Sequence, residues 1–208
     1  WCEIPAGRYT IGGDKAAYHP LEAQQFIVKQ SYKLAKYPIT AIQFEAFLKA
    51  EDGFERDAWW EGLTQEHRKQ SVNEQYFPVD NHPRENVSWY QAIAYTRWLT
   101  AQYHAAELLS EEWEIRLPTE EEWEAAARYP DGRLFVWGSE YVSGYANIDE
   151  TETQVGTHYH LRQTTAVGIY PQGCNPTNDL HDLSGNVWEW TLSEWDAPAQ
   201  ARLDGDRT

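Results

Sequence analysis

Methionine is absent from all 208 residues, position 1 included, and only two cysteines, Cys2 and Cys174, are present. We interpret the missing methionine as a sign that the chain is an internal piece of a longer translation product, a trimmed chain or a processed one. Two cysteines that form no Cys-x-x-Cys pair exclude, by count, a disulfide framework and a zinc or thioredoxin-like site. They are either two free, partly buried thiols, which we favour, or one long-range bridge.

Basic residues are also scarce, because 17 Lys and Arg stand against 33 Asp and Glu, which gives a formal net charge of −16. Binding to a nucleic-acid backbone needs clustered Lys and Arg, so we expect no nucleic-acid partner. The acidic excess could tolerate bound cations, although a solvated, self-repelling surface explains most of the charges.

Long hydrophobic runs are missing from the chain. No segment approaches the ~20 apolar residues that a membrane span requires, and the opening WCEIPAG lacks the basic and apolar regions of a signal peptide. We therefore expect no membrane span and favour a cytoplasmic location. No linker rich in proline, glycine and serine divides the sequence, so we expect one domain over residues 1–208.

Aromatic rings, in contrast, are abundant, with eleven tryptophans and thirteen tyrosines. Flat amphipathic rings suit both a loop-rich core and a recognition surface. We expect four of the tryptophans to lie in the core, because each belongs to a periodic apolar segment or to a helix-staple position. These four are Trp98, Trp123, Trp188 and Trp190.

Residues 1–39 alternate between apolar and polar side chains in short bursts, which predicts strands. Helices are expected where a Ser or Thr precedes a Gln or Glu by three residues, because the two side chains can satisfy the unpaired amides of a helix start. This pattern predicts three helices, and a weaker pattern predicts a fourth around residues 57–70. Residues 130–178 predict long loops that carry short strands. The three helix starts are Thr40 with Gln43, Ser88 with Gln91 and Thr119 with Glu122.

Residues 179–191, DLHDLSGNVWEWT, combine acidic side chains with a Gly-Asn turn signal and a Trp-Glu-Trp alternation. If the Ser-Gly-Asn stretch turns, two carboxylates and two backbone carbonyls can surround one point, and such mixed oxygen ligands suit Ca²⁺. Alternatively, the segment is an ordinary acidic turn between strands, with its glutamate solvated. The four predicted ligands are Asp182, the carbonyls of Gly185 and Val187, and Glu189.

Eight sequence blocks follow one another along the chain: IPAG with GG, YPIT with QFEAF, NHPRENVSWYQAIAYTRWL, RLPTEEEWEAAAR, VWG, YANI, TTAVGIYPQG and DLSGNVWEWT. In this order they resemble the formylglycine-generating (sulfatase-modifying-factor) family across nearly the whole chain. The resemblance implies an α+β protein with the C-type lectin-like fold of the formylglycine-generating subtype. Such a fold is loop-rich, with a small mixed sheet and a few helices.

The resemblance also implies two structural Ca²⁺ sites. The first falls on the four ligands named above in residues 179–191. The second uses Asn147, the carbonyl of Ile148 and an acid further along the chain. That acid is missing at the aligned position, and Asp149 or Glu150 could substitute for it.

The catalytic metals of the family have no counterpart in these residues. True formylglycine-generating enzymes bind copper through a cysteine pair that follows the Trp-Glu-Trp block, and neither Cys2 nor Cys174 lies in a matching position. The iron-dependent sulfoxide synthases of the same fold need a His-x-x-x-His-x-Glu module, which is absent. His158 and His160 could chelate a metal from one side of a strand, but loop histidines are more often solvated. We therefore carry over no catalytic residue and expect no formylglycine-generating activity, since the family's C-terminal segment is missing.

Three functions remain in competition. The first is a non-catalytic display scaffold, which resembles the variable proteins of diversity-generating retroelements and would bind a protein or other macromolecule through its C-terminal face. The second is a copper-dependent oxidase that converts a substrate cysteine to formylglycine. The third is a sensor or structural module of a larger bacterial protein. Ca²⁺ would be structural, and copper would be needed only by the oxidase.

Overall fold

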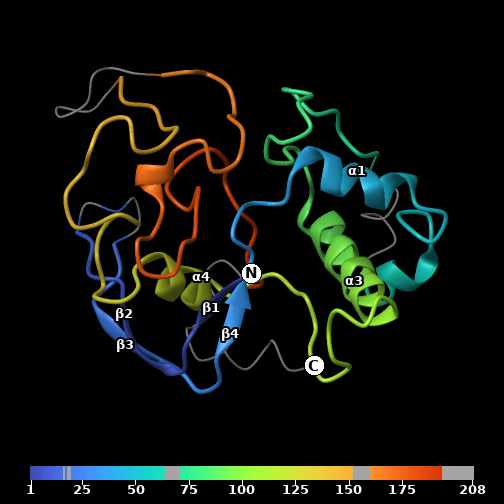
Figure 1. The fold of residues 1–208 in the computed structure, drawn as a ribbon, viewed down its shortest axis with the longest axis horizontal. Helices are drawn as coiled ribbons and strands as arrows, with labels where there is room; N and C mark the ends of the chain where they lie inside the picture. Colours follow the sequence, from blue (N-terminus) through green and yellow to red (C-terminus); the bar gives the residue numbers. More distant parts are fainter. Residues whose placement is uncertain (16, 18–19, 64–70, 152–159, 194–208) are drawn as a thin grey trace. The chain divides into compact units, whose positions relative to one another are not determined.

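The computed structural model describes residues 1–15, 17, 20–63, 71–151 and 160–193. The chain divides into two compact units. We call Trp1–Pro38 together with Pro118–Thr208 the terminal unit, and Ile39–Leu117 the central unit (Figure 1). Each unit has its own cluster of buried hydrophobic side chains. The single domain expected over residues 1–208 stays a prediction.

The strands of the terminal unit form two antiparallel pairs. β1 (Cys2–Ile4) pairs with β4 (Tyr32–Leu34), and β2 (Gly7–Ile11) pairs with β3 (Gln24–Val28). The side chains alternate along β1, so that the first and third residues are buried and the second is exposed. Short strands predicted for residues 1–39 are therefore confirmed.

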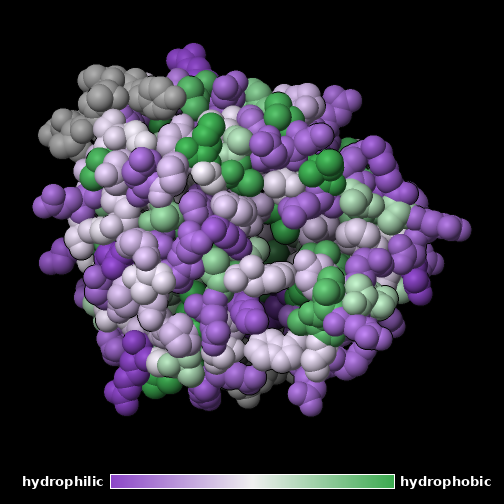
Figure 2. All heavy atoms as spheres, in the orientation of Figure 1, coloured by the Kyte–Doolittle hydropathy of each residue, from purple (hydrophilic) through white to green (hydrophobic). Residues whose placement is uncertain are grey.

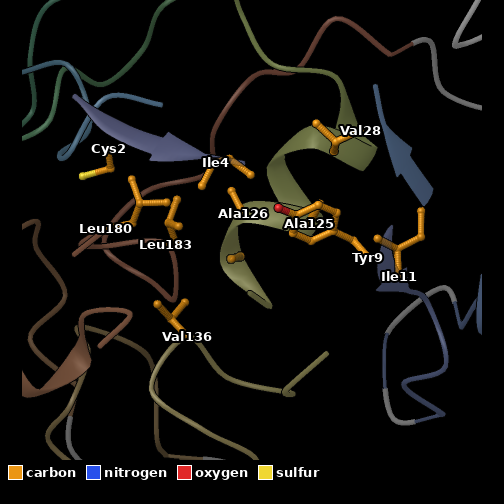
Figure 3. Packing of buried hydrophobic residues seen from close by; sticks show 11 residues of the cluster. Cys2, Ile4, Tyr9, Ile11, Val28, Ala125, Ala126, Val136, Leu180 and Leu183 are labelled. Atoms are coloured by element: carbon orange, nitrogen blue, oxygen red, sulfur yellow. The ribbon is translucent and has the colours of Figure 1, made fainter. Parts of the chain in front are cut away.

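Helix α4 (Glu120–Ala127) packs against β2 and β3 in the terminal unit. Its capping box is formed as predicted, since the Thr119 hydroxyl accepts from the Glu122 amide at 3.1 Å and the Glu122 carboxylate accepts from the Thr119 amide at 2.9 Å. Alanines on its inner face lie within the core, and the absence of a larger side chain lets the strands approach the helix. Figure 3 shows the alanines between the β1 side and the β2 side of this cluster.

Loops complete the terminal unit after α4. Within the described part of residues 130–178, the regular structure is limited to the 3₁₀ helix η2 (Pro171–Gly173) and an isolated bridge between Phe135 and Gly138. The buried Asn175 holds the last of these loops, because its side-chain amide donates to the Tyr129 carbonyl at 2.8 Å. Long loops were predicted here, and the buried polar side chain explains how one of them is fixed.

The central unit contains α1 (Ala41–Lys49), η1 (Asp57–Trp60) and α3 (Trp89–Ala105). Both α-helices begin with the predicted capping boxes. They lie side by side, and aromatic rings fill the space between them and η1 (Figure 1). The fourth predicted helix begins as η1, while residues 64–70 of that prediction lie outside the described residues. The buried rings of this cluster are Phe44, Phe47, Trp60, Tyr95 and Trp98.

Two of the four tryptophans predicted to be core are buried or packed in the core. Trp98 is only 8% exposed, and Trp123 packs against the cluster of the terminal unit. The prediction is wrong for Trp188, which is 102% exposed, and for Trp190, which is 50% exposed. The Trp-Glu-Trp alternation indicates that the two indoles share one side of the chain, but it does not indicate whether that side is buried. Here Glu189 is also exposed in part, although its carboxyl group is desolvated, and the described residues around it form no strand ladder.

The face of the molecule drawn in Figure 2 carries mostly hydrophilic side chains, with hydrophobic ones scattered between them. This distribution agrees with the large excess of acidic over basic residues. Among the helices that the structure describes, none combines the length and the apolar character needed to cross a bilayer.

Replacement of Trp98 by Ala should lower the free energy of unfolding by about 3–5 kcal/mol, because it empties a buried, ring-lined site. The matched variant Trp188→Ala should change it by less than about 0.5 kcal/mol, because that side chain is exposed. Urea denaturation followed by far-UV circular dichroism measures both values. Equal losses in the two variants would contradict the different environments of these indoles.

Candidate functional site

The loop that was predicted to bind Ca²⁺ turns at Gly185. Its φ angle of +107° lies in the left-handed region, and the Val187 amide donates to the Gly185 carbonyl at 2.9 Å. A Cβ atom at this position would lie 2.6 Å from the Asn147 carbonyl oxygen, so glycine is required both by the backbone angle and by the close approach. The predicted Ser-Gly-Asn turn is therefore present.

Asn186 links this turn to two neighbouring loops. Its side-chain oxygen accepts from the Thr165 amide at 2.9 Å, and its side-chain nitrogen donates to the Thr165 carbonyl at 3.2 Å. Its own amide donates to the Asn147 carbonyl at 2.9 Å. A single side chain thus replaces the hydrogen bonds that a strand ladder would supply, and it fixes the backbone around the turn.

Two acidic groups beside the turn influence each other electrostatically. Asp182 accepts from the Gly168 amide at 2.6 Å, and burial raises the pKa of its carboxyl group. Part of Glu189 is exposed to solvent, but its carboxyl group is enclosed by protein. This desolvation raises the pKa of Glu189 to about 7; the Trp123 indole opposes the rise, and the nearby Asp182 carboxylate adds to it.

The Trp123 indole gives a second indication of an incomplete site. Its Nε1 atom is buried without a hydrogen-bond partner among the described residues, and it lies near enough to Glu189 to favour the charged carboxylate. The two groups are thus close together but not hydrogen-bonded. A cation between Asp182 and Glu189 would relieve the repulsion of two enclosed carboxylates.

The donor chemistry of the first predicted site fits Ca²⁺, which takes carboxylate and carbonyl oxygens. Asp182 and Glu189 would supply the carboxylates, and Gly185 and Val187 would supply carbonyls from the turn. The electrostatic influence of the two acidic groups on each other supports this ligand set. The complete site stays a prediction.

The second predicted Ca²⁺ site gains less support. The Asn147 carbonyl accepts from Asn186, and the side-chain nitrogen of Asn147 donates to the Gln163 carbonyl at 2.8 Å. Ile148 lies beside Gly185. The site at Asn147 and Ile148 therefore stays a prediction, although the first of these residues clearly helps to hold the turn.

The two acids that could complete the second site are already engaged. One oxygen of Asp149 accepts from the Thr151 amide at 2.9 Å, and the other lies 3.1 Å from His160 Nδ1. Glu150 is 1% exposed and accepts hydrogen bonds from Tyr141 and Ser143. His158 lies outside the described residues, so the predicted His158 and His160 chelate stays a prediction.

A further cluster of possible metal ligands was missed by the sequence reasoning. One donor atom each from Cys174, Asp179 and His181 lies within 4.8 Å of the other two. The spacing of these three residues along the sequence matches no short metal-binding motif. The loop bends between them and brings their side chains together. Cys2 and Cys174 are both free, which confirms the alternative that we favoured over a bridge.

These loops and turns, on a scaffold of short strand pairs and capped helices, define the class of the protein. Residues 2–205 match the family described as Sulfatase-modifying factor enzyme 1-like domain (FGE-sulfatase), and the chain belongs to this family. The family and the α+β fold implied by the eight sequence blocks are therefore confirmed.

Individual relatives differ in how much of their length is matched. The chain is 32% identical to "Formylglycine-generating enzyme" of Streptomyces coelicolor, over 94% of this chain and 68% of the relative. It is 26% identical to "Hercynine oxygenase" of Mycolicibacterium smegmatis, over 91% of this chain and 44% of the relative. It is 35% identical to "Inactive C-alpha-formylglycine-generating enzyme 2" of Bos taurus, over 57% of this chain and 35% of the relative. The chain thus spans less than half the length of the last two proteins.

Removal of Ca²⁺ should destabilise the protein, because the ion would bind the folded loop and not the unfolded chain. We expect a chelator to lower the melting temperature of the parent protein, and Ca²⁺ to restore it. In the presence of Ca²⁺, Glu189→Gln should have a lower melting temperature than the parent, and this temperature should no longer respond to the chelator. The control variant Glu3→Gln, at an exposed position of β1, should keep the response of the parent. A parent melting temperature that does not respond to Ca²⁺ would disprove the site.

Stabilisation by Ca²⁺ should also depend on pH. The folded state binds the Glu189 proton more tightly than the unfolded state does, because the pKa is about 7 instead of 4.5. Without Ca²⁺, this group therefore lowers stability as the pH rises from about 4.5 to about 7. Ca²⁺ needs the ionised carboxylate, so the gain in melting temperature on adding Ca²⁺ should grow over the same range. The assignment would be contradicted if the gain in melting temperature did not depend on pH in the parent. It would also be contradicted if the gain in Glu189→Gln depended on pH as strongly as in the parent.

Proposed function

We propose that the chain forms the scaffold domain of an oxidase of the formylglycine-generating class, which oxidises a substrate cysteine with molecular oxygen and copper. The observation that carries the proposal is the match to "Formylglycine-generating enzyme" of Streptomyces coelicolor over 94% of this chain. The match to "Hercynine oxygenase" over 91% of the chain also supports an oxidative reaction. These relatives support the oxidase better than the display scaffold that we placed first.

The residues described here do not supply the copper site of such an enzyme. Cu(I) is bound tightly by paired thiolates. Cys2 Sγ instead donates to the Asp179 carbonyl at 3.6 Å, and Cys174 belongs to a cluster of mixed donors. We therefore assign no step of the reaction to copper on these residues. The contribution of this domain is to hold the loops around Gly185 and Asn186 in place.

The loop network makes this scaffolding role physically reasonable. Catalytic groups must keep their positions to within a fraction of an ångström, and loops achieve this only when their backbone groups are satisfied. The hydrogen bonds from Asn186 to Thr165 and Asn147 meet that need, and a Ca²⁺ ion at Asp182 and Glu189 would add to them. In this proposal Ca²⁺ is structural and copper serves the reaction.

The second candidate is a non-catalytic binding scaffold, of the kind found in the variable proteins of diversity-generating retroelements. One specific observation favours it, because Trp188 and Trp190 are exposed next to the rigid turn. Exposed indoles often dominate binding energy at protein interfaces. A relative named "Inactive C-alpha-formylglycine-generating enzyme 2" is consistent with loss of catalysis on this scaffold. A macromolecular ligand would then bind through this face.

An oxidation assay separates the two candidates. The protein is loaded with Cu(I) and Ca²⁺ and incubated with oxygen, a thiol reductant and a peptide that contains Cys-x-Pro-x-Arg. Conversion exchanges the thiol for an aldehyde, with loss of the sulfur as hydrogen sulfide, and mass spectrometry of the hydrazide-labelled peptide detects it. Because these 208 residues contain no cysteine pair for copper, we expect product only when the domain is joined to a segment that supplies one, and then with the cysteine peptide but not with a serine peptide or without oxygen.

The controls decide how a negative result is read. The expected Ca²⁺ response of the melting temperature and a measured copper content show that the protein is folded and loaded. If such a protein, joined to that segment, yields no aldehyde, the oxidase proposal is wrong for this substrate and the binding scaffold gains support. Loss of product in Cys174→Ser, with retention in Cys2→Ser, would reveal a catalytic contribution from the mixed-donor cluster.

A further inference from the structure

The cluster of Cys174, Asp179 and His181 lies in the terminal unit, in the loop that precedes the predicted Ca²⁺ turn. One ligand atom from each side chain lies within 4.8 Å of the other two. A thiolate, a carboxylate and an imidazole are each established ligands of zinc, and three of them leave one position of a tetrahedron for water. The three side chains therefore have the chemistry and the proximity of a metal site.

The backbone of this loop is fixed without a metal. The Asn175 amide donates to the Leu180 carbonyl at 2.8 Å, and the Asn175 carbonyl accepts from the Asp179 amide at 2.8 Å. These two bonds close the loop on itself directly between the cluster's ligands. The His181 amide donates to the Lys36 carbonyl at 3.0 Å, which ties the end of the loop to the chain after β4. The side-chain ligands are thus held close together by hydrogen bonds of the loop's backbone.

The imidazole of His181 is placed to act as a ligand. The residue is 8% exposed, and its Nδ1 atom is buried without a hydrogen-bond partner in the part of the chain that the structure describes. Its Nε2 atom lies 3.1 Å from a carboxylate oxygen of Asp179. The ring edge that faces Asp179 is therefore the Nε2 edge, and a tautomer with its proton on Nδ1 carries the lone pair on Nε2. A cation between this nitrogen and the Asp179 carboxylate would replace their direct contact.

The positive charge already present does not block the site. The Lys36 ammonium contacts the other carboxylate oxygen of Asp179. This pair is partly exposed, with 34% of the Lys36 side chain and 62% of the Asp179 side chain accessible to solvent. An exposed ion pair contributes little to stability, so the flexible lysine can turn into solvent when a divalent cation binds.

We propose that Cys174, Asp179 and His181 bind a divalent cation of the zinc type, with water in the remaining position. This site is separate in its residues from the predicted Ca²⁺ ligands and from the copper chemistry of the proposed oxidase. The cysteine count excluded a zinc site because it considered only paired cysteines. A mixed donor set needs one thiol, and the fold supplies the other two ligands from the same loop.

Cobalt titration of the full chain tests the proposal. Co²⁺ bound to a thiolate gives a charge-transfer band and, in a tetrahedral site, intense visible bands. We expect both with one equivalent of Co²⁺, and we expect Zn²⁺, but not Ca²⁺, to remove them. Cys174→Ser should abolish the charge-transfer band, and His181→Gln should weaken binding by at least about tenfold.

Two matched variants serve as controls. Cys2→Ser removes the other thiol, and His160→Gln removes a histidine that pairs with Asp149 at 3.1 Å outside the cluster. Both should keep the cobalt spectrum of the parent. If Cys2→Ser abolishes the charge-transfer band and Cys174→Ser does not, or if the parent gives no band with Co²⁺, the assignment is overturned.

A measurement on the parent protein covers the case in which a variant does not fold. Zn²⁺ should slow alkylation of Cys174 at least about tenfold, because the metal-bound thiolate is withdrawn from reaction. Mass spectrometry of the digested protein reports the rate for each cysteine, and Ca²⁺ is the matched ion that should not protect Cys174. An unchanged alkylation rate in saturating Zn²⁺ would overturn the site.

Discussion

The hydrogen bonds of Asn186 are the constraint on which the organisation of the candidate site depends. Its side chain pairs with both backbone groups of Thr165, and its own amide holds the carbonyl of Asn147. The described residues around it form no sheet, so these bonds supply what a ladder would provide elsewhere. A left-handed glycine beside it allows the loops to approach within a distance that no other residue permits. The positions of Asp182 and Glu189 follow from this arrangement.

Polar side chains also satisfy backbone groups where the strands meet α4. The Glu124 carboxylate accepts from the Gly12 amide at 2.8 Å, and it pairs with Arg128, which in turn donates to the Gly12 carbonyl. The charged pair thus satisfies both backbone groups of a turn residue instead of only each other. A loop-rich protein with short strands has many such orphan groups, and its polar side chains are used to satisfy them. Buried Asn175 does this for the loop that carries the Cys174 cluster.

Local signals were sufficient to predict the helices. The pairs Thr40 with Gln43, Ser88 with Gln91 and Thr119 with Glu122 lie within one helical turn, so the sequence contains both partners of each capping box. The strands of the first 39 residues were found for the same reason, because alternation is a property of neighbouring residues. The turn at Gly185 was also predictable from a local signal, whereas the Ca²⁺ ligand set around it stays a prediction.

Non-local arrangements were not predictable in this way. The Trp-Glu-Trp alternation could not show which side of the chain faces inward, because that depends on Trp123 and Asp182, which come from other segments or turns. The Cys174 cluster was missed because closure of its loop depends on Asn175, whose side chain reaches back to Tyr129. A side chain that bonds a backbone group 46 residues away leaves no periodic trace in the sequence.

The sequence blocks that define the family carry mainly scaffold information. The Thr119 capping box, the Gly185 turn and the Asn186 hydrogen bonds belong to these blocks, and each of them has a structural role in this chain. Relatives of the chain are named as a formylglycine-generating enzyme, a hercynine oxygenase and an inactive protein. One scaffold therefore accommodates different chemistry, and a fold alone does not determine a reaction. Function in this family must be decided by the groups that the scaffold holds, which is why a thiol, a carboxylate and an imidazole fixed in one loop matter more than the overall resemblance.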